Sequence, residues 1–367
     1  MAHPLSGVGA KSRPEQHLKK VWTIPGTKSP ALTMYGHSRS MGGTAFHIPE
    51  LKWHLDAGNS NLPGSTHVWV THGHQDHCLV LGGCAAGWVM THLPTQIYCP
   101  TAITDFIGRY VRGALELNFG ARITAESARA AHCPEPYASR EFPWPYDVIG
   151  MDAGASTPVC VPGHPGKPIK SGYHVETFAC DHSVPTIGYG FFKVRQSLKD
   201  EYRGLPGKEL GRLRAAGVEL NDTVRNRVFA FLGDTSEAVF ESARNPDLLL
   251  YPVIIVECTF LYDEHADDAA ARKHCHWRRL EPIVRAHPDT TFVLIHFSLR
   301  YSDAEVLAFF DAMADARPAN ILPWVCTPEE AARLAEAGVS AAADVDALVA
   351  GGGVAGSTDG ATGGAGG

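Results

Sequence analysis

Residues 68–77 read Val68-Trp69-Val70-Thr71-His72-Gly73-His74-Gln75-Asp76-His77, and this run is the most informative part of the chain. Three apolar residues are typical of a buried strand, and three histidines and a carboxylate then follow within six residues. A strand that ends in this way directs its polar side chains into one small space. Imidazole nitrogen and carboxylate oxygen are ligands that zinc prefers, so the run predicts a metal site. The alternative is a polar loop rich in histidine, since the chain contains 19 of them.

Other apolar runs along the chain also end in a single histidine or aspartate. These candidate partners are Asp56, His182, Asp234 and His296. Enzymes built on sheets place their ligands where strands meet loops. One such residue alone is more often structural, but together with the cluster at 72–77 they predict a metal centre.

These motifs resemble those of the metallo-β-lactamase superfamily and, within it, the tRNase Z (ribonuclease Z) group. The pattern His-x-His-x-Asp-His is met by residues 72–77, and Gly233-Asp234-Thr235 is similar to the superfamily's bridging-carboxylate motif. His182 with Gly188-Tyr189 matches a further motif. Residues 295–301 are close to the group's His-Phe-Ser-Gln-Arg-Tyr signature, with Leu299 in place of Gln. The resemblance covers roughly residues 30 to 305 and implies an α/β fold, a metallo-β-lactamase-like four-layer αββα sandwich.

The resemblance also implies two Zn²⁺ ions per chain. The first would be held by His72, His74 and His182, the second by Asp76, His77 and His296, with Asp234 bridging the two. Two divalent ions lower the pKa of a shared water, so that hydroxide exists at neutral pH, and they neutralise charge on phosphate oxygens.

Two aspartates near the ligands have further expected roles. Asp76 would also orient the attacking water or accept its proton. Asp56 is expected to support the ligand loop from behind rather than to bind an ion. The alternative for Asp56 is a turn aspartate before Gly58.

A leaving alkoxide needs a proton, and the tRNase Z group supplies it from a histidine paired with a glutamate. Glu257 and His274 fit these two positions by resemblance, which makes them candidate catalytic residues together with Asp76. The chain differs from the group's motifs at two places beside this pair. Val256 occupies the position of the group's first histidine, and Cys275-His276 replaces Ser-Thr. The alternative for His274 is an exposed helix residue. His276 is expected at the surface, outside the metal site.

Composition favours a soluble enzyme. The 367 residues carry a formal net charge of −7, and no apolar run reaches the roughly 18 residues of a membrane span. The first 20 residues lack the apolar core of a secretory signal. Nine cysteines without a Cys-x-x-Cys pair indicate reduced thiols, so a cytoplasmic location is expected.

Prolines, glycines and helix-capping residues along the chain predict its organisation. We expect a mobile N-terminal segment (1–20), a single metallo-β-lactamase-like domain (21–350) and a disordered Gly-rich tail (351–367). A helix is expected near 101–116, and eight prolines make 133–168 a connecting excursion over the surface without regular helix or central strand. Strands are expected near 173–180, 188–195, 227–232, 252–256 and 291–295, and capping boxes predict helices after Ser302 and Thr327.

The substrate arm of the tRNase Z group lies between His182 and Asp234, and here these residues are only 52 positions apart. The segment Lys193–Arg214 contains seven basic residues against three acidic ones, an excess that could hold phosphate. A solvated helix over 207–216 is the alternative.

Three functions remain open. The first is a dinuclear zinc phosphodiesterase, an endoribonuclease of tRNase Z type that acts on precursor tRNA. The second is a hydrolase of the same fold that acts on a small ester, thioester, lactone or cyclic phosphodiester. The third, a catalytically silent RNA- or protein-binding relative, is disfavoured because every ligand position is filled. The resemblance also implies a homodimer.

Overall fold

The computed structural model describes residues 20–25, 31–59, 65–87, 92, 94–241, 243–327 and 329–330. The expected Gly-rich tail lies outside these residues, as does all of the expected N-terminal segment except Lys20, which opens a strand.

Strands β1 to β7 form one sheet and follow each other in chain order. Neighbours from β1 to β4 pair antiparallel, and neighbours from β4 to β7 pair in parallel. The strands are β1 (Lys20–Ile24), β2 (Leu32–Arg39), β3 (Gly43–Ile48), β4 (Trp53–Leu55), β5 (His67–Trp69), β6 (Thr95–Pro100) and β7 (Tyr146–Met151).

Strands β8 to β14 form a second sheet, again in chain order. Here β8 to β11 pair antiparallel and β11 to β14 pair in parallel. The strands are β8 (Ser156–Pro158), β9 (Tyr173–Ala179), β10 (Ile187–Leu198), β11 (Asn221–Phe231), β12 (Val253–Glu257), β13 (Thr291–Ile295) and β14 (Ile321–Pro323).

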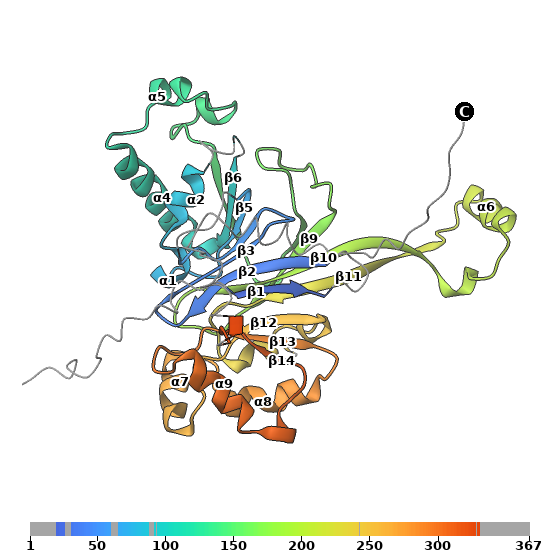
Figure 1. Cartoon of the computed structure of the whole chain (residues 1–367). Helices are drawn as coiled ribbons and strands as arrows, with labels where there is room; N and C mark the ends of the chain where they lie inside the picture. Colours follow the sequence, from blue (N-terminus) through green and yellow to red (C-terminus); the bar gives the residue numbers. More distant parts are fainter. Residues whose placement is uncertain are drawn as a thin grey trace, which may run out of the picture.

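Helices cover the outer face of each sheet (Figure 1). On the first sheet lie α2 (Leu81–Ala86), α4 (Thr104–Phe119) and α5 (Ala125–Ala130); on the second lie α7 (Ala266–Arg272), α8 (Trp277–Ala286) and α9 (Asp303–Asp311). The remaining described α-helices are α1 (Gln75–Cys78) and α6 (Gly207–Ala215).

The alternation of side chains along the strands builds the layers. In β13, Val293 and Ile295 pack into the core between the two sheets, whereas Phe292 and Leu294 pack into the core under α8 and α9. Successive strand residues point to opposite faces, so an apolar strand buried on both faces supplies two cores at once. The predicted four-layer α/β sandwich is confirmed.

Most predicted elements agree with the structure. The helix expected near 101–116 is a short 3₁₀ turn followed by α4, and the five expected strands correspond to β9–β13. Both reciprocal hydrogen bonds of a capping box join Ser302 and Glu305 at the start of α9. The same two bonds join Thr327 and Glu330, although the helix that would follow lies beyond the described residues.

The proline-rich segment 133–168 needs a correction, because it contributes two strands rather than only a surface excursion. β7 and β8 lie in it, each at the outer edge of its sheet. β7 falls between Pro145 and Pro158, where no proline removes a backbone donor. The segment supplies no central strand, as the prolines predict.

An arm projects from the second sheet (Figure 1). It consists of the outer halves of β10 and β11, paired from Lys193↔Asn226 to Leu198↔Asn221, with α6 near its tip. Both strands are longer than predicted, because their outer halves are polar and carry no alternating apolar pattern. The solvated helix expected over 207–216 is present as α6, which buries none of its side chains.

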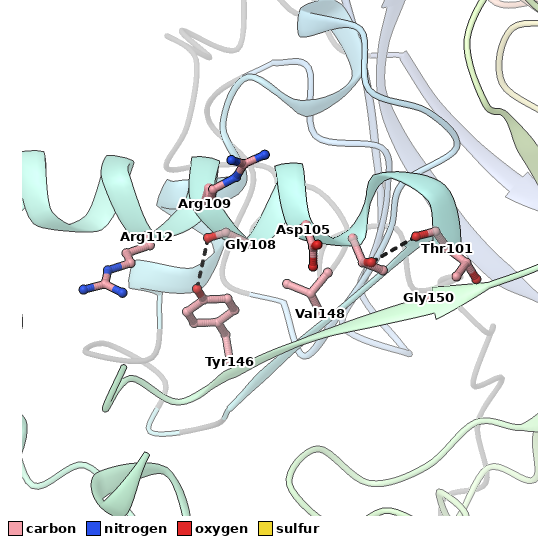
Figure 2. A pocket seen from close by; sticks show the side chains of 9 residues that line it. Thr101, Asp105, Gly108, Arg109, Arg112, Tyr146, Val148 and Gly150 are labelled. Atoms are coloured by element: carbon pink, nitrogen blue, oxygen red, sulfur yellow. Dashed lines mark hydrogen bonds between the residues drawn. The ribbon is translucent and has the colours of Figure 1, made fainter. Parts of the chain in front are cut away.

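A groove separates α4 from the edge strand β7 (Figure 2). Arg109 and Arg112 of the helix and Tyr146 of the strand line it, and none of the predicted metal ligands does. Among the described residues, no helix is long and apolar enough to cross a bilayer.

Candidate active site

The predicted site residues gather where strands of the two sheets end. Asp56 follows β4, and the first candidate ligand, His72, comes three residues after the end of β5. In the second sheet, Asp234 follows β11 and His296 follows β13. Because these strands run in parallel within each sheet, their carboxyl ends meet at one edge. His182 comes three residues after the end of β9. Because β9 and β11 are both antiparallel to β10, β9 ends at the same edge of the sheet as β11.

Asp56 holds the ligand loop in place. The Asp56 carboxylate is fully buried and accepts hydrogen bonds from the Thr71 amide (2.7 Å) and the Thr71 hydroxyl (3.0 Å). It also accepts one from His77 Nδ1 at 2.7 Å. Close packing requires Gly58 here, since a Cβ on it would lie 1.6 Å from the Asp76 carbonyl oxygen. Asp56 therefore supports the loop from behind, as predicted, and is more than a turn aspartate.

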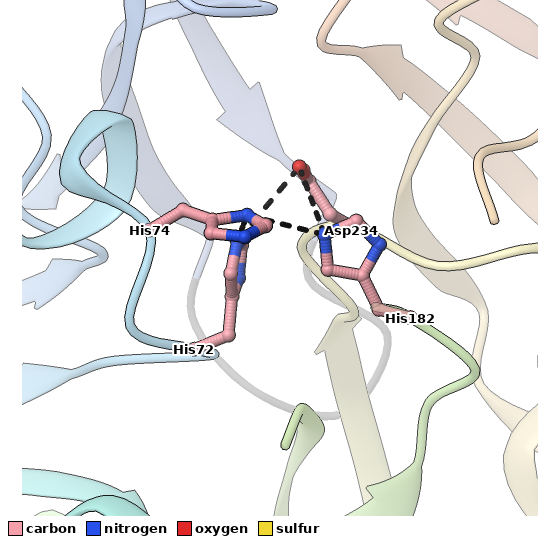
Figure 3. A group of neighbouring side chains, drawn as sticks. All are labelled: His72, His74, His182 and Asp234. Atoms are coloured by element: carbon pink, nitrogen blue, oxygen red, sulfur yellow. Dashed lines mark hydrogen bonds and ion pairs between the residues drawn. The ribbon is translucent and has the colours of Figure 1, made fainter. Parts of the chain in front are cut away.

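The first group of candidate ligands is His72, His74, His182 and Asp234, whose ligand atoms lie within 4.8 Å of one another (Figure 3). His74 Nδ1 is 3.1 Å from His72 Nε2 and 3.3 Å from His182 Nε2. Asp234 Oδ2 is 3.9 Å from His72 Nε2. Three imidazole nitrogens and one carboxylate oxygen thus converge on a common space.

The second group is Asp76, His77 and His296, also within 4.8 Å. Asp76 Oδ2 is 3.5 Å from His296 Nε2 and 3.9 Å from His77 Nε2. Asp234 faces this group too, with Oδ1 3.2 Å from His77 Nε2 and Oδ2 3.4 Å from His296 Nε2. Asp234 is therefore placed between the groups, the position that the resemblance implies for a bridging carboxylate.

Hydrogen bonds outside the groups select which nitrogen each ring presents. His77 donates from Nδ1 to Asp56, and His182 donates from Nδ1 to the Lys273 carbonyl at 3.2 Å. Nδ1 of His72 meets the Thr71 hydroxyl, which itself donates to Asp56. In each case Nε2 is left facing the shared space. Such outer contacts fix the tautomer and orientation of metal-binding histidines.

The donor atoms inside the cluster fit a cation. Among the described residues, His77 Nε2, His296 Nε2 and Asp234 Oδ1 are buried without a hydrogen-bond partner. Buried polar atoms are rarely left in that state without a reason. Imidazole and carboxylate donors without thiolate are the set that a divalent cation such as zinc accepts.

Burial and the neighbouring carboxylates have opposite effects on the pKa values of the histidines in the cluster. Burial lowers the pKa of His72, His74 and His182, which keeps these rings neutral and available as ligands. Burial opposes a charge on His77 as well, but Asp234 and Asp56 raise the pKa of His77 well above its usual value. A proton on His77 would balance the carboxylates, and a bound cation would fill the same role in its place.

Glu257 and His274 form a pair beside the cluster. His274 Nδ1 lies 2.7 Å from Glu257 Oε1, and Glu257 is fully buried. Burial opposes protonation of His274, but the charge and hydrogen bond of Glu257 raise its pKa to about 9. The His274 side chain is 13% exposed, so it is not the exposed helix residue of the alternative. Since Glu257 occupies Nδ1, Nε2 is the nitrogen that can meet a substrate.

His274 also belongs to a third group of candidate metal ligands, with Asp234 and His296. One of its ring nitrogens lies within 4.8 Å of ligand atoms of Asp234 and His296. The ring therefore borders the cluster closely enough to reach a group bound there.

Thr259, which the motif analysis did not single out, connects the pair to the cluster. Its hydroxyl lies 2.5 Å from Glu257 Oε2 and 3.0 Å from His296 Nδ1. The hydroxyl donates to the carboxylate and accepts from His296, which leaves His296 Nε2 for the cluster. In the sequence, only its position two residues after Glu257 could have indicated this role for Thr259.

Lys273 is a second residue that sequence reasoning missed. Its carbonyl accepts from His182, and its ammonium lies 2.9 Å from Asp181 Oδ1. A left-handed backbone (φ 56°) at the end of α7 turns the carbonyl towards His182. No side-chain pattern marks a residue that acts through its carbonyl.

His276 is a correction, because it was expected at the surface. It is 1% exposed and caps α8, accepting from the Arg278 amide at 3.1 Å. Its Nε2 contacts the Tyr262 carbonyl, so it does not belong to either candidate ligand group.

Comparisons with known proteins agree with this geometry. The chain is 25% identical over 330 residues to the chloroplastic tRNase Z TRZ2 of Arabidopsis thaliana, covering 87% of this chain and 83% of the relative. It is 26% identical over 294 residues to tRNase Z TRZ1 of the same plant, covering 78% and 91%. The chain is therefore similar in sequence to tRNase Z proteins over most of its length.

Among solved structures, the human tRNase Z short form (ELAC1) is similar with a TM-score of 0.42 and 19% identity, over 77% of this chain and 94% of that one. No family model matches the chain. The predicted resemblance to the tRNase Z group and the predicted hydrolase class are confirmed.

Proposed function

We propose that this tRNase Z-like protein is a dinuclear zinc phosphodiesterase that cleaves precursor tRNA near its 3′ end. The observation that carries the proposal is the convergence of seven histidine and aspartate side chains with a buried Glu257–His274 pair beside them. The tRNase Z relatives support the choice of RNA as substrate.

The two groups around Asp234 would each hold one divalent cation. When bound, such cations polarise a phosphate and activate a water for attack. Zinc is the proposed metal, because the donors are imidazoles and carboxylates. We expect about two equivalents of zinc in protein purified from zinc-sufficient medium, measured by elemental analysis. Only trace metal would contradict the proposal.

The chain's own residues supply the acid–base chemistry. Asp76 lies at the open side of the cluster with its side chain 20% exposed, and it would orient the attacking water or accept its proton. Its pKa is about 2, because His296 and His77 outweigh the effect of burial, so it is ionised at neutral pH. His274 would donate a proton from Nε2 to the leaving oxygen.

The arm would hold the RNA away from the centre. Lys199, Lys208 and Arg214 lie on it without a carboxylate partner among the described residues, whereas Arg203 and Arg212 pair with neighbouring acids. Exposed positive charges on a projecting element suit a phosphate backbone. A homodimer and a cytoplasmic location remain predictions.

A second candidate is a hydrolase of small esters, thioesters, lactones or cyclic phosphodiesters. The observation that favours it is the absence of two signature residues, since Leu299 replaces Gln and Val256 replaces His. A panel assay distinguishes the candidates: precursor tRNA, bis(p-nitrophenyl) phosphate, a lactone and a thioester, each with and without chelator. Chelator-sensitive cleavage of precursor tRNA supports the first candidate. Cleavage of a small substrate without any cleavage of RNA supports the second.

A further inference from the structure

The turn between β2 and β3 carries an unusual residue at the mouth of the metal-binding cluster. Met41 has a left-handed backbone (φ 58°), and the residue is 82% exposed. A non-glycine residue in this conformation stores strain, and an unbranched apolar side chain gains nothing from so much exposure. Folding therefore does not account for a methionine at this position.

The backbone of the turn has a clear structural role. The Met41 amide donates to Asp76 Oδ2 at 2.9 Å, the same oxygen that faces His296 Nε2. The neighbouring Ser40 amide donates to the Phe297 carbonyl at 3.2 Å, so the turn is fixed next to both Asp76 and the segment after His296. Any residue except proline supplies this amide N–H, and glycine would supply it with less strain.

The side chain therefore needs a separate explanation. It starts from a backbone held within hydrogen-bonding distance of Asp76, a candidate ligand whose side chain is 20% exposed. Leu299, which stands where the tRNase Z signature has Gln, lies alongside, because a Cβ on Gly42 would be 3.5 Å from Leu299 Cδ2. Leu299 is therefore a second apolar residue next to this turn.

We propose that Met41 contacts a nucleobase next to the scissile phosphate and thereby contributes to substrate specificity. A phosphodiester bond in RNA has a flat aromatic base on each side, and a methionine thioether makes favourable contacts with aromatic rings. The rigid turn presents this side chain without further ordering of the backbone. The inference rests on the proposed RNA-cleaving function and adds a contact to it.

The test compares three variants on two RNAs. Met41→Gly removes the side chain and suits the left-handed backbone, and Met41→Leu restores an apolar side chain. Lys52→Gly is the matched control, because Lys52 is also exposed and left-handed (φ 54°). It lies after the far end of β3, a six-residue strand of about 20 Å, whereas Met41 lies before its near end. The RNAs are a precursor tRNA and the same RNA with abasic nucleotides on both sides of the cleaved bond.

For intact RNA, Met41→Gly should raise KM about tenfold with kcat changed less than twofold, the scale of a thioether–ring contact. Met41→Leu, which restores an apolar side chain but no thioether, should recover only part of the loss. On the abasic RNA, the difference between wild type and Met41→Gly should fall below twofold. Zinc content should stay the same in every variant, and Lys52→Gly should match wild type throughout.

Several results would overturn the proposal. An unchanged KM for Met41→Gly on intact RNA would remove the base contact. Equal losses on both RNAs, together with lost zinc, would show that the turn only positions Asp76. A similar loss in Lys52→Gly would point to a general effect of left-handed turns. A wild-type protein that cleaves neither RNA would overturn the proposed function itself. This outcome is distinct from failure of the Met41 contact, because the wild type alone reveals it.

Discussion

The metal-binding cluster, built where strands of both sheets end, and the arm, which extends the second sheet, differ in how rigidly their side chains are held. In the cluster, four of the six candidate histidine and aspartate side chains that meet Asp234 are almost fully buried. His72, His77, His182 and His296 each have a second ring contact that orients them. The arm, by contrast, consists of two paired strands and a helix without buried side chains. Catalysis needs fixed positions, whereas contact with a large substrate needs reach.

This contrast implies that the two regions can be damaged separately. Backbone hydrogen bonds between β10 and β11 hold the outer arm, and these do not involve the cluster. Changes in the cluster should therefore affect every substrate, and changes in the arm should affect only large ones.

The largest effect is expected for Asp234→Ala. Asp234 faces both candidate ligand groups, so its loss should abolish hydrolysis of every substrate and lower the zinc content. Elemental analysis and the chromogenic phosphodiester assay measure the two outcomes.

The control is His276→Ala, which removes a buried histidine outside both groups. It should cost about 1 kcal/mol of stability through the lost cap of α8 and should retain zinc. Full zinc and activity in Asp234→Ala would show that Asp234 does not bridge.

The next largest effect is expected for His274→Ala. Cleavage of a substrate with a poor alkoxide leaving group should slow by roughly 10²–10⁴-fold, because general acid catalysis is lost. A p-nitrophenolate leaving group needs no proton, so such an ester should barely change. Steady-state rates on both substrates provide the test, and equal losses would assign His274 another role, such as binding a cation with Asp234 and His296.

The pH dependence of the same reaction gives a second measurement. Glu257 raises the pKa of His274 to about 9, so its acid form persists at neutral pH and is lost as the pH rises through that value. Cleavage of the alkoxide substrate should then decline on the alkaline side. Bound cations oppose protonation, so about 9 is the upper limit for this decline. His274→Ala should remove this limb of the pH–rate profile.

A smaller effect is expected for Asp56→Asn. The Asp56 carboxylate orients His77 but is not itself in either ligand group. Loss of such an outer contact typically weakens metal affinity by about 10–100-fold. Competition with a chelator measures this change. Unaltered affinity would mean that burial and the loop backbone hold His77 without the carboxylate.

The sequence predicted the cluster better than it predicted the arm, and the reason is physical. Strand ends that deliver His72, Asp234 or His296 leave a pattern of apolar residues followed by one polar residue. The outer halves of β10 and β11 are held by backbone hydrogen bonds between polar residues, which leave no such pattern.

Contacts made by the backbone escaped prediction for a similar reason. The Lys273 carbonyl and the Met41 amide both contact the cluster through backbone atoms, which do not depend on the side chain. Only the left-handed conformation of each residue marks it, and that conformation is visible in the fold. Likewise β7 is hidden in a proline-rich stretch because an edge strand tolerates neighbouring prolines.

The smallest effect on chemistry is expected from the arm. Changing Lys199, Arg203 and Lys208 to Glu should weaken binding of precursor tRNA and flatten its salt dependence, because fewer counterions are released when fewer phosphates are contacted. Hydrolysis of bis(p-nitrophenyl) phosphate should survive, since the cluster is untouched. The matched control reverses three exposed charges elsewhere, in Arg122→Glu, Arg129→Glu and Lys170→Glu, and so gives the same net charge. Binding titrations at several salt concentrations separate the two triple variants. If both lose affinity equally, overall charge governs binding. If neither does, α6 and its flanks are only a solvated surface.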